Sequence, residues 1–436
     1  MNVTLSATMP QQSATSDVKL SQRADWAAGQ PISELMSRAL ANPDLISLAA
    51  GFVDGETLPT EPTRQALESI LSDDSVARSA LQYGTTPGYP PLREALLSQI
   101  VQQDSIDPDR LSVDQVIVTA GSNQLLHLVV ESLLDPGDIV LCAAPTYLVF
   151  LGTLSNIGGR SIGVACDDLG MVPDALEASL QKIEADGELA RVKAIYLVPY
   201  FDNPRGLTMP LERRAAIVEI AKRWSKKGKI HVIADAAYRA LRYEGDDIAS
   251  TQTCDAEGDT VIVAGTFSKS FSPGIRVGWG VLPKHLVAPV CDQKGNIDFG
   301  SPNFSQHLIA KVLELDLLVP HIERIRENYR RKRDAMLAAA DEFLSTIPGV
   351  SWTRPSGGLY IWAELPESID TGPQGSLFDV AIAEGMLYVP GQFTFPPEGE
   401  PVKKNTMRLS FGVQSCGKIR DGIVALARAI EKVMEG

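Results

Sequence analysis

Short apolar segments alternate with amphipathic stretches between about residues 50 and 310. The apolar segments are rich in β-branched residues and are flanked by turn signals, which is typical of strands buried on both faces of a parallel sheet. The stretches between them have the period of helices that can cover those faces. We therefore expect an α/β fold with a mainly parallel sheet covered by helices on both faces. The expected strands are residues 116–118, 139–142, 194–198, 230–234 and 260–264.

A long charged segment follows this region. Residues 321–344 carry an apolar stripe at helical spacing, so we expect one long helix that begins after Pro320. Strand-like segments at 356–365 and 407–411 and a final helix near 418–434 come after it. This mixture of elements predicts a second, smaller α+β domain.

The length of the chain agrees with more than one domain. It has 436 residues, and one domain usually takes 100 to 200 residues. Residues 1–20 are rich in Ser, Thr and Gln, and we expect them to form a flexible arm. We assign residues 50–310 to the large domain, and residues 21–49 together with 311–436 to the small domain.

Composition and charge exclude several classes of function. The chain is 44% hydrophobic and 22% charged, which is typical of a globular protein. Its net charge of −14 would repel nucleic acid and anionic lipid, so we expect no partner of either kind and expect any phosphate to be held by a local site. No apolar run is long enough to span a membrane, and the N-terminal stretch lacks the features of a signal peptide.

The cysteines give no sign of a disulfide framework or a zinc site. There are five of them, widely spaced and without a CxxC pair. We therefore expect no metal and a cytoplasmic location.

The most informative segment is GTFSKSFSPGIRVGW, residues 265–279. Lys269 follows an expected strand, at the end where α/β sheets bind their ligands. Burial beside another cation can lower the pKa of such a lysine and make its amine reactive. Thr266, Ser268 and Arg276 supply hydroxyls and a guanidinium suited to a phosphate dianion. A lysine beside a phosphate site suggests pyridoxal phosphate; the alternative is a solvated loop lysine.

Other strand ends can supply the remaining contacts of such a cofactor. Asp235 ends an expected strand and can keep a pyridine nitrogen protonated, or it can simply cap a helix. Tyr238, three residues later, can donate to the ring oxygen. Asn203 lies in an Asn-Pro turn after another strand, and Tyr147 can stack on a ring or belong to the core.

The segment TAGSN, residues 119–123, precedes an expected helix over 124–134. A helix that begins at Gly121 and Ser122 presents free amides and the positive end of its dipole to an anion. Most such helix starts bind only water.

Together these residues resemble the fold-type I pyridoxal phosphate aminotransferases of class I and II, the family that includes aspartate, aromatic and 2-aminoadipate aminotransferases. The resemblance runs from about residue 48 to the end of the sequence, and the motifs occur in the order of the family. It implies that Lys269 binds the cofactor aldehyde, that Asp235 contacts the pyridine nitrogen, and that Asn203 and Tyr238 contact the ring oxygen. The other implied cofactor contacts are Tyr147 by stacking, and Gly121, Ser122, Asn123, Thr266, Ser268 and Arg276 around the phosphate.

The resemblance extends to three further positions. LQYGTTPGYPPLREAL resembles a family segment whose tyrosine, here Tyr83, reaches the phosphate of the neighbouring subunit, which implies a homodimer. NTMRLSF resembles the strand whose arginine, here Arg408, holds the substrate carboxylate. Gly51 matches the family's glycine near the substrate, but Phe52 and Val53 replace the usual residues after it.

In relatives that take aminoadipate, an N-terminal arginine pairs with the distal carboxylate. The matching position here carries Ser33, with Arg23 and Arg38 nearby. A strict preference for dicarboxylic substrates is therefore not expected.

The implied reaction transfers the α-amino group of an amino acid to a 2-oxo acid by a ping-pong mechanism, in which the Lys269 amine moves the α-proton. One alternative is a lyase or decarboxylase, since such enzymes share this kind of site. The other is a ligand-sensing module, because some transcription regulators carry an aminotransferase-like domain behind a winged helix. The residues before the matching region are mostly neutral or acidic, which disfavours the regulator.

Overall fold

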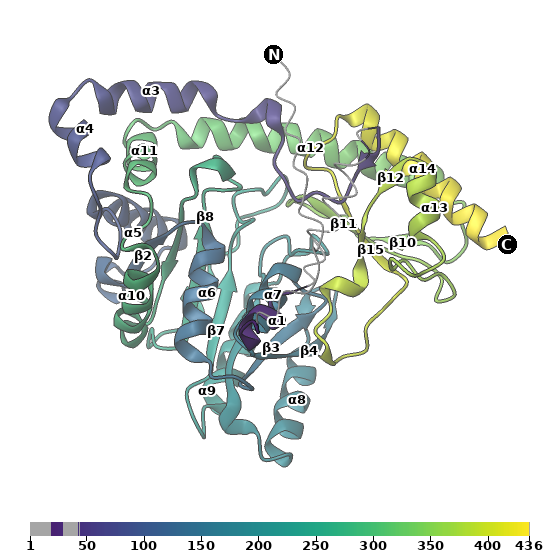
Figure 1. Cartoon of the computed structure of the whole chain (residues 1–436), viewed down its shortest axis with the longest axis horizontal. Helices are drawn as coiled ribbons and strands as arrows, with labels where there is room; N and C mark the ends of the chain where they lie inside the picture. Colours follow the sequence, from purple (N-terminus) through teal and green to yellow (C-terminus); the bar gives the residue numbers. More distant parts are fainter. Residues whose placement is uncertain (1–18, 29–41, 43, 436) are drawn as a thin grey trace.

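A large central sheet dominates the computed structural model, which describes residues 19–28, 42 and 44–435 (Figure 1). It has nine strands, eight of them in the order β14-β4-β3-β6-β7-β8-β9-β2, with β5 paired to β4. Their bounds are β2 Val116–Thr119, β3 Ile139–Ala144, β4 Arg160–Asp167, β5 Gly170–Met171, β6 Val192–Leu197, β7 His231–Asp235, β8 Val261–Thr266, β9 Gly278–Val281 and β14 Glu398–Gly399.

The sheet is mainly parallel, as the sequence predicts. All five predicted strands are present, with ends within two residues of the predicted ones. The sequence analysis missed β4 and β9. β9 is antiparallel to both of its neighbours and is rich in glycine, which weakens the strand signal. Gly278 is needed there because a Cβ would come within 2.4 Å of the backbone of Gly121.

Helices cover both faces of the large sheet. Strand side chains alternate between two buried apolar clusters, with Val140 in one and Leu141 in the other. The first cluster includes residues of α6 Ser122–Leu133, α7 Leu148–Asn156 and α10 Lys284–Asp298. The second includes residues of α3 Thr60–Leu71, α4 Asp74–Leu81, α5 Pro90–Asp104, α8 Pro173–Ala185, α9 Leu211–Trp224 and α11 Asn303–Glu314.

A smaller antiparallel sheet lies beside the large one, in the order β10-β11-β15-β13. A parallel pair, β1 and β12, joins the beginning of the described chain to its C-terminal part. The bounds in this region are β1 Ile46–Ser47, β10 Ser351–Trp352, β11 Tyr360–Glu364, β12 Met386–Leu387, β13 Val389–Pro390, β15 Thr406–Ser410, α13 Phe378–Ala383 and α14 Cys416–Glu435. The two predicted strands and the final helix are confirmed.

The predicted long helix is α12, Leu318–Phe343, which runs along the top of Figure 1 from the large sheet to the small one. Its predicted start was wrong, because the helix begins two residues before Pro320. Proline is tolerated there since the amides of a first helical turn have no partner within the helix.

Two further contacts complete the fold. The short helix α1, Gln22–Trp26, packs on α7 (Figure 1). The strand β14 leaves the C-terminal part of the chain and pairs with β4 of the large sheet.

Most of the predicted arm, residues 1–18, lies outside the described residues. Among the described residues no helix is long and apolar enough to cross a membrane.

Candidate active site

A cavity of about 280 Å³ lies where the carboxyl ends of the large sheet's parallel strands meet α6. Phe52 and Pro273 contribute to its walls. Ten of the predicted site residues line it: Ser122, Asn123, Tyr147, Asn203, Asp235, Tyr238, Thr266, Ser268, Lys269 and Arg276. The fold thus gathers side chains that are up to 154 positions apart, from Ser122 to Arg276, in one place.

Lys269 follows β8 and turns its amine into this region. Its Nζ donates to the carbonyl oxygen of Gly51 at 2.7 Å. Burial lowers the pKa of Lys269, and the positive charges of Arg408 and Arg276 lower it further. A lysine in these surroundings gives up its proton more readily than one in water, as a nucleophilic amine must.

Asp235 is the last residue of β7 and is buried. Its carboxylate accepts from the Tyr196 hydroxyl at 3.0 Å and from the Ala237 amide at 3.1 Å. Burial raises the pKa of Asp235 to about 6. No cation of the described residues forms an ion pair with it, and no α-helix begins directly after it, so the helix-cap interpretation is wrong. The site fits a ligand that brings a positive charge to this carboxylate.

The opposite end of the cavity suits an anion. Gly121 precedes α6 with a φ of +88°, and a Cβ there would come within 2.4 Å of the Arg276 guanidinium. Arg276 donates to the Ala120 carbonyl at 3.1 Å and to the Ser268 hydroxyl at 3.5 Å. Thr266 donates to the same Ser268 hydroxyl at 3.0 Å. Guanidinium, hydroxyls and the start of α6 form a donor set that can hold a phosphate.

Arg408 is buried on β15, with 2% of its surface exposed. Its Nη1 donates to Oδ1 of Asn203 and its Nη2 to the carbonyl of Ala49, each at 2.8 Å. Its Nε has no hydrogen-bond partner among the described residues, and no carboxylate of those residues pairs with it. A buried guanidinium without an anion is suited to a planar carboxylate ligand. Asn203 connects it to the cavity.

Tyr360 is a residue of this site that the sequence analysis missed. Its hydroxyl lies 3.1 Å from that of Tyr238, and Arg408 lies 4.3 Å from the centre of its ring. Burial alone would raise the pKa of Tyr360, but the charges of Arg408 and Lys269 bring it below its ordinary value. Tyr360 belongs to the site because β11 pairs with β15, the strand that carries Arg408, and no signal in its own segment indicates this.

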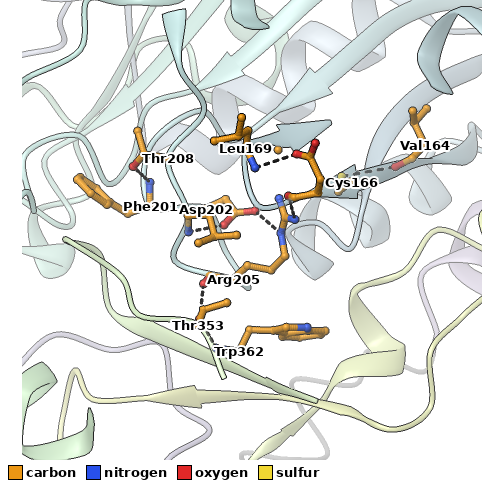
Figure 2. Close-up of polar contacts among 12 residues, drawn as sticks. Val164, Cys166, Leu169, Phe201, Asp202, Arg205, Thr208, Thr353 and Trp362 are labelled. Atoms are coloured by element: carbon orange, nitrogen blue, oxygen red, sulfur yellow. Dashed lines mark hydrogen bonds and ion pairs between the residues drawn. The ribbon is translucent and has the colours of Figure 1, made fainter. Parts of the chain in front are cut away.

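The loop that carries Asn203 is fixed by a buried ion pair (Figure 2). Asp202 accepts from the Arg205 guanidinium at 3.0 Å and from the Leu207 amide at 2.8 Å. Arg205 also donates to the Asp167 carbonyl at 2.7 Å. These contacts hold the loop in the position from which Asn203 reaches Arg408 and, at 3.4 Å, the hydroxyl of Tyr238.

Two predicted aromatic residues lie in very different surroundings. Tyr147 lines the cavity and donates to Asn123 at 3.4 Å, and burial raises the pKa of its hydroxyl. Tyr83 does not line the cavity of its own chain. It is 80% exposed and makes an edge-to-face contact with Phe299, which is also exposed.

Arg23, one of the two arginines near the position that pairs with a distal carboxylate in relatives, does not line the cavity. Arg23 pairs with Glu131 at 3.0 Å, near the end of α6 that lies away from Ser122. Ser33 and Arg38 lie outside the described residues.

Comparison with known proteins assigns the family. The family described as "Aminotransferase class I and II" matches residues 43–415. The aromatic-amino-acid aminotransferase 1 of Thermococcus litoralis is 38% identical over 411 residues, which cover 94% of each chain. Among solved structures, the multiple substrate aminotransferase of Thermococcus profundus has a TM-score of 0.87 and 35% identity, covering 95% of this chain and 98% of that one.

A third relative carries the cofactor in its amine form. The kynurenine aminotransferase of Pyrococcus horikoshii, whose structure includes PMP, has a TM-score of 0.86 and 36% identity, covering 95% of this chain and 97% of that one. The predicted fold, cofactor and amino-group transfer are therefore confirmed, in preference to the lyase, decarboxylase and ligand-sensing alternatives. The chain belongs to the class I and II aminotransferases, pyridoxal phosphate-dependent enzymes that move an amino group from an amino acid to a 2-oxo acid.

Proposed function

We propose that this enzyme uses Lys269, Asp235 and Arg408 as the central groups of a ping-pong transamination. The observation that carries the proposal is a pattern of charge. Among the described residues, none of these three side chains has an ionic partner, although all three are largely buried. Their signs complement a cofactor with a cationic ring and a substrate with an anionic carboxylate.

The cavity residues divide the task of holding the cofactor. Ser122, Ser268 and Arg276, with the amides at the start of α6, hold the phosphate, and Gly121 leaves room for it. Asp235 would keep the ring nitrogen protonated, Tyr238 and Asn203 would donate to the ring oxygen, and Tyr147 would stack on the ring. Asn123 and Thr266 support this set through Tyr147 and Ser268.

The reaction depends on where the protein holds charges and protons. Pyridoxal phosphate, when bound, supplies an aldehyde for the substrate amine and a ring that delocalises the electrons left at Cα. Arg408 fixes the substrate carboxylate and so sets which Cα bond can break. The Lys269 amine, with its lowered pKa, would take the α-proton of the substrate and hold it for its return.

We further propose a homodimer in which Tyr83 completes the phosphate site of the partner. Tyr83 lies outside its own cavity and contacts the exposed ring of Phe299. Leu81 and Ile297, each two residues from one of these rings in the sequence, are exposed as well. Exposed apolar residues in one area are typical of a protein interface. A Tyr83→Phe variant that stays dimeric but loses affinity for the cofactor would support this contact.

The preferred amino donor is proposed to be aromatic or otherwise large and apolar. Phe52, which is 54% exposed, lines the cavity together with Tyr147. The cations among the described lining residues are Lys269 and Arg276, which are assigned to the cofactor. The names of the relatives in Thermococcus litoralis and Pyrococcus horikoshii agree with this choice. A kcat/KM for phenylalanine below that for 2-aminoadipate would contradict it.

The division into domains is part of the same proposal. Residues 50–310 would hold the cofactor, while residues 21–49 and 311–436 form the smaller domain that supplies Arg408. The pairing of β1 with β12 supports joining the two separated segments. A cytoplasmic location is supported by the cysteines, all five of which are free.

Covalent trapping tests the assignment of Lys269. Borohydride treatment of the cofactor-loaded enzyme should place the added mass on the peptide that contains Lys269. Lys269→Ala should lower kcat by about 10⁴-fold or more, the upper range for a group in general acid–base catalysis. Lys403→Ala, which removes a surface lysine paired with Glu364, serves as the control and should retain activity. Adduct on another lysine would refute the proposal.

A further inference from the structure

The two residues between β2 and α6, Ala120 and Gly121, lie at the anion-binding end of the candidate active site. Both polar groups of the Ala120 backbone have partners. Its carbonyl accepts from the Arg276 guanidinium at 3.1 Å, and its amide donates to Oε1 of Gln124 at 2.7 Å. The peptide groups at Ala120 are therefore held from two sides.

Gln124 lies in the first turn of α6 and uses both ends of its amide group. While its Oε1 accepts from Ala120, its Nε2 donates to Oδ2 of Asp298 at 2.8 Å. The Ser301 hydroxyl donates to the same Oδ2 at 3.1 Å and lies 3.4 Å from Oε1 of Gln124. One side chain thus connects the turn before α6 to a residue 174 positions later.

Asp298 is itself held in place. It is the last residue of α10, a helix that packs on α6. Its Oδ1 accepts from the ammonium group of Lys294 at 3.0 Å. Lys294 is completely buried, and losing one partner of such an ion pair is strongly destabilising. The carboxylate therefore presents a fixed acceptor to Gln124.

The contacts of Gln124 lead to the phosphate side of the site, whereas Lys269 and Arg408 bond to other parts of the chain. Ala120 is followed by Gly121, whose φ of +88° turns the chain into α6. Loss of the Gln124 contact would leave the Ala120 amide without its acceptor. It would loosen the turn that directs the first amides of α6 at an anion.

We propose that Gln124 and Asp298 are positioning residues of the phosphate site. Gln124 holds the Ala120 peptide in the orientation that directs the amides of α6 and the Arg276 guanidinium at the phosphate, and Asp298 holds Gln124. Loss of this link should weaken the hold on the phosphate group and leave the hold on the pyridine ring unchanged. The inference rests on the proposed cofactor site.

Pyridoxal, which lacks the phosphate group, separates the two parts of the cofactor. Equilibrium dialysis of the cofactor-free enzyme gives dissociation constants for pyridoxal and for pyridoxal phosphate, and the first divided by the second measures the preference for phosphate. Gln124→Met removes both hydrogen bonds and keeps a similar length. It should bind pyridoxal phosphate about tenfold more weakly and pyridoxal as the wild type does. A preference equal to or above that of the wild type would overturn the proposal.

Gln115 offers a matched control just before β2. Its buried side chain also accepts from a backbone amide, that of Ser112 at 3.1 Å, and donates through Nε2, to the Leu282 carbonyl at 3.0 Å. Gln115→Met should therefore leave the preference for phosphate unchanged. A fall as large as that in Gln124→Met would show a general effect of destabilisation and refute the positioning role.

A double variant tests Asp298 without leaving a buried charge unpaired. Lys294→Met combined with Asp298→Leu removes both charges, a replacement that is often neutral for stability. Gln124 then keeps Ala120 but loses its own acceptor, so the preference for phosphate should fall about threefold, the effect of one ordinary hydrogen bond. A wild-type preference in this variant would overturn the role of Asp298.

The wild-type measurement separates this inference from the proposed function. If the wild type bound pyridoxal as tightly as pyridoxal phosphate, the proposed phosphate site would be wrong, and the inference with it. A wild-type preference for phosphate that Gln124→Met retains would refute the inference alone.

Discussion

Two sets of buried charges lie close together in this enzyme and are arranged in opposite ways. Asp202 and Arg205 pair with each other at 3.0 Å behind the cavity (Figure 2). Asp235 and Arg408 are buried to a similar degree, yet among the described residues each has only neutral partners. Burying an unpaired charge costs free energy. In a buried ion pair, the attraction between the two charges offsets part of that cost.

The difference separates groups that shape the site from groups that act in it. The Asp202 pair is complete without a ligand and fixes the loop of Asn203. In our proposal, Asp235 and Arg408 find their charged partners only when the cofactor ring and the substrate carboxylate bind. Substitutions in the first set should therefore change stability, and substitutions in the second set should change catalysis.

Among substitutions in these two sets of charges, the largest effect is expected for Asp235→Asn. It removes one partner of the proposed buried ion pair with the cofactor ring, which costs about 3–5 kcal/mol, or about 10²- to 10⁴-fold in kcat/KM. Steady-state kinetics at saturating cofactor would measure it. Asp202→Asn is the matched control and should lose far less activity. Equal losses in both variants would remove the distinction between the two sets.

The stability of the cofactor-free enzyme should show the cost of the unpaired Asp235. Its pKa of about 6 in the folded chain, against 3.8 as its ordinary value, means that folding favours the protonated form. Protonation of Asp235 therefore contributes to the free energy of unfolding below about pH 4. This contribution, about 3 kcal/mol in total, is lost as the pH rises through 6.

Urea unfolding of the cofactor-free wild type and of Asp235→Asn between pH 4 and pH 7 would measure this loss. The variant should lack the decrease, because its amide does not titrate. Parallel curves for the two proteins would show that Asp235 is not the group responsible.

Asp202→Asn should lower the free energy of unfolding by about 2 kcal/mol, because the uncharged amide has one acceptor oxygen and cannot accept from both Arg205 and the Leu207 amide. Chemical denaturation at constant pH would measure it. The exposed pair of Asp341 and Arg354 offers a control, since Asp341→Asn should cost less than about 1 kcal/mol. If the buried pair proved as unimportant as the exposed one, it would not fix the Asn203 loop.

Tyr360→Phe should have the smallest effect. It removes one hydroxyl contact with Tyr238, worth about 1 kcal/mol, and should lower kcat/KM by about fivefold while shifting the pH profile of kcat. Tyr388→Phe removes a buried hydroxyl that donates to Thr371 in the small sheet region, and it should leave the profile unchanged. An identical pH profile for Tyr360→Phe and wild type would exclude a role for Tyr360 in protonation at the site.

The sequence predicted the residues whose chemistry is carried by a local motif. Lys269 with its hydroxyl neighbours, and Asp235 at the end of an apolar strand, could be recognised because strand ends meet at one edge of a parallel sheet. Their gathering around one cavity confirms this geometric part of the prediction.

Other features of the site and of the fold depend on contacts between segments that are distant in the sequence, and these features could not be predicted. Tyr360 belongs to the site because β11 pairs with β15, beside Arg408, and nothing within its own segment indicates this. β9 was missed because its glycines are required by the close approach of Gly121 to Gly278 and of Leu125 to Gly280, contacts that arise only in the folded sheet.

The short strand β14 closes an edge that would otherwise be open. Without it, the outer amides and carbonyls of β4 would be available to strands of other molecules, a common route to aggregation. Glu398 holds this cover through two contacts with Arg160, at 3.0 and 2.7 Å. Gly399 lies so close that a Cβ would come within 2.3 Å of the Gly163 carbonyl. The C-terminal part of the chain therefore covers the edge of the large sheet as well as carrying the buried Arg408.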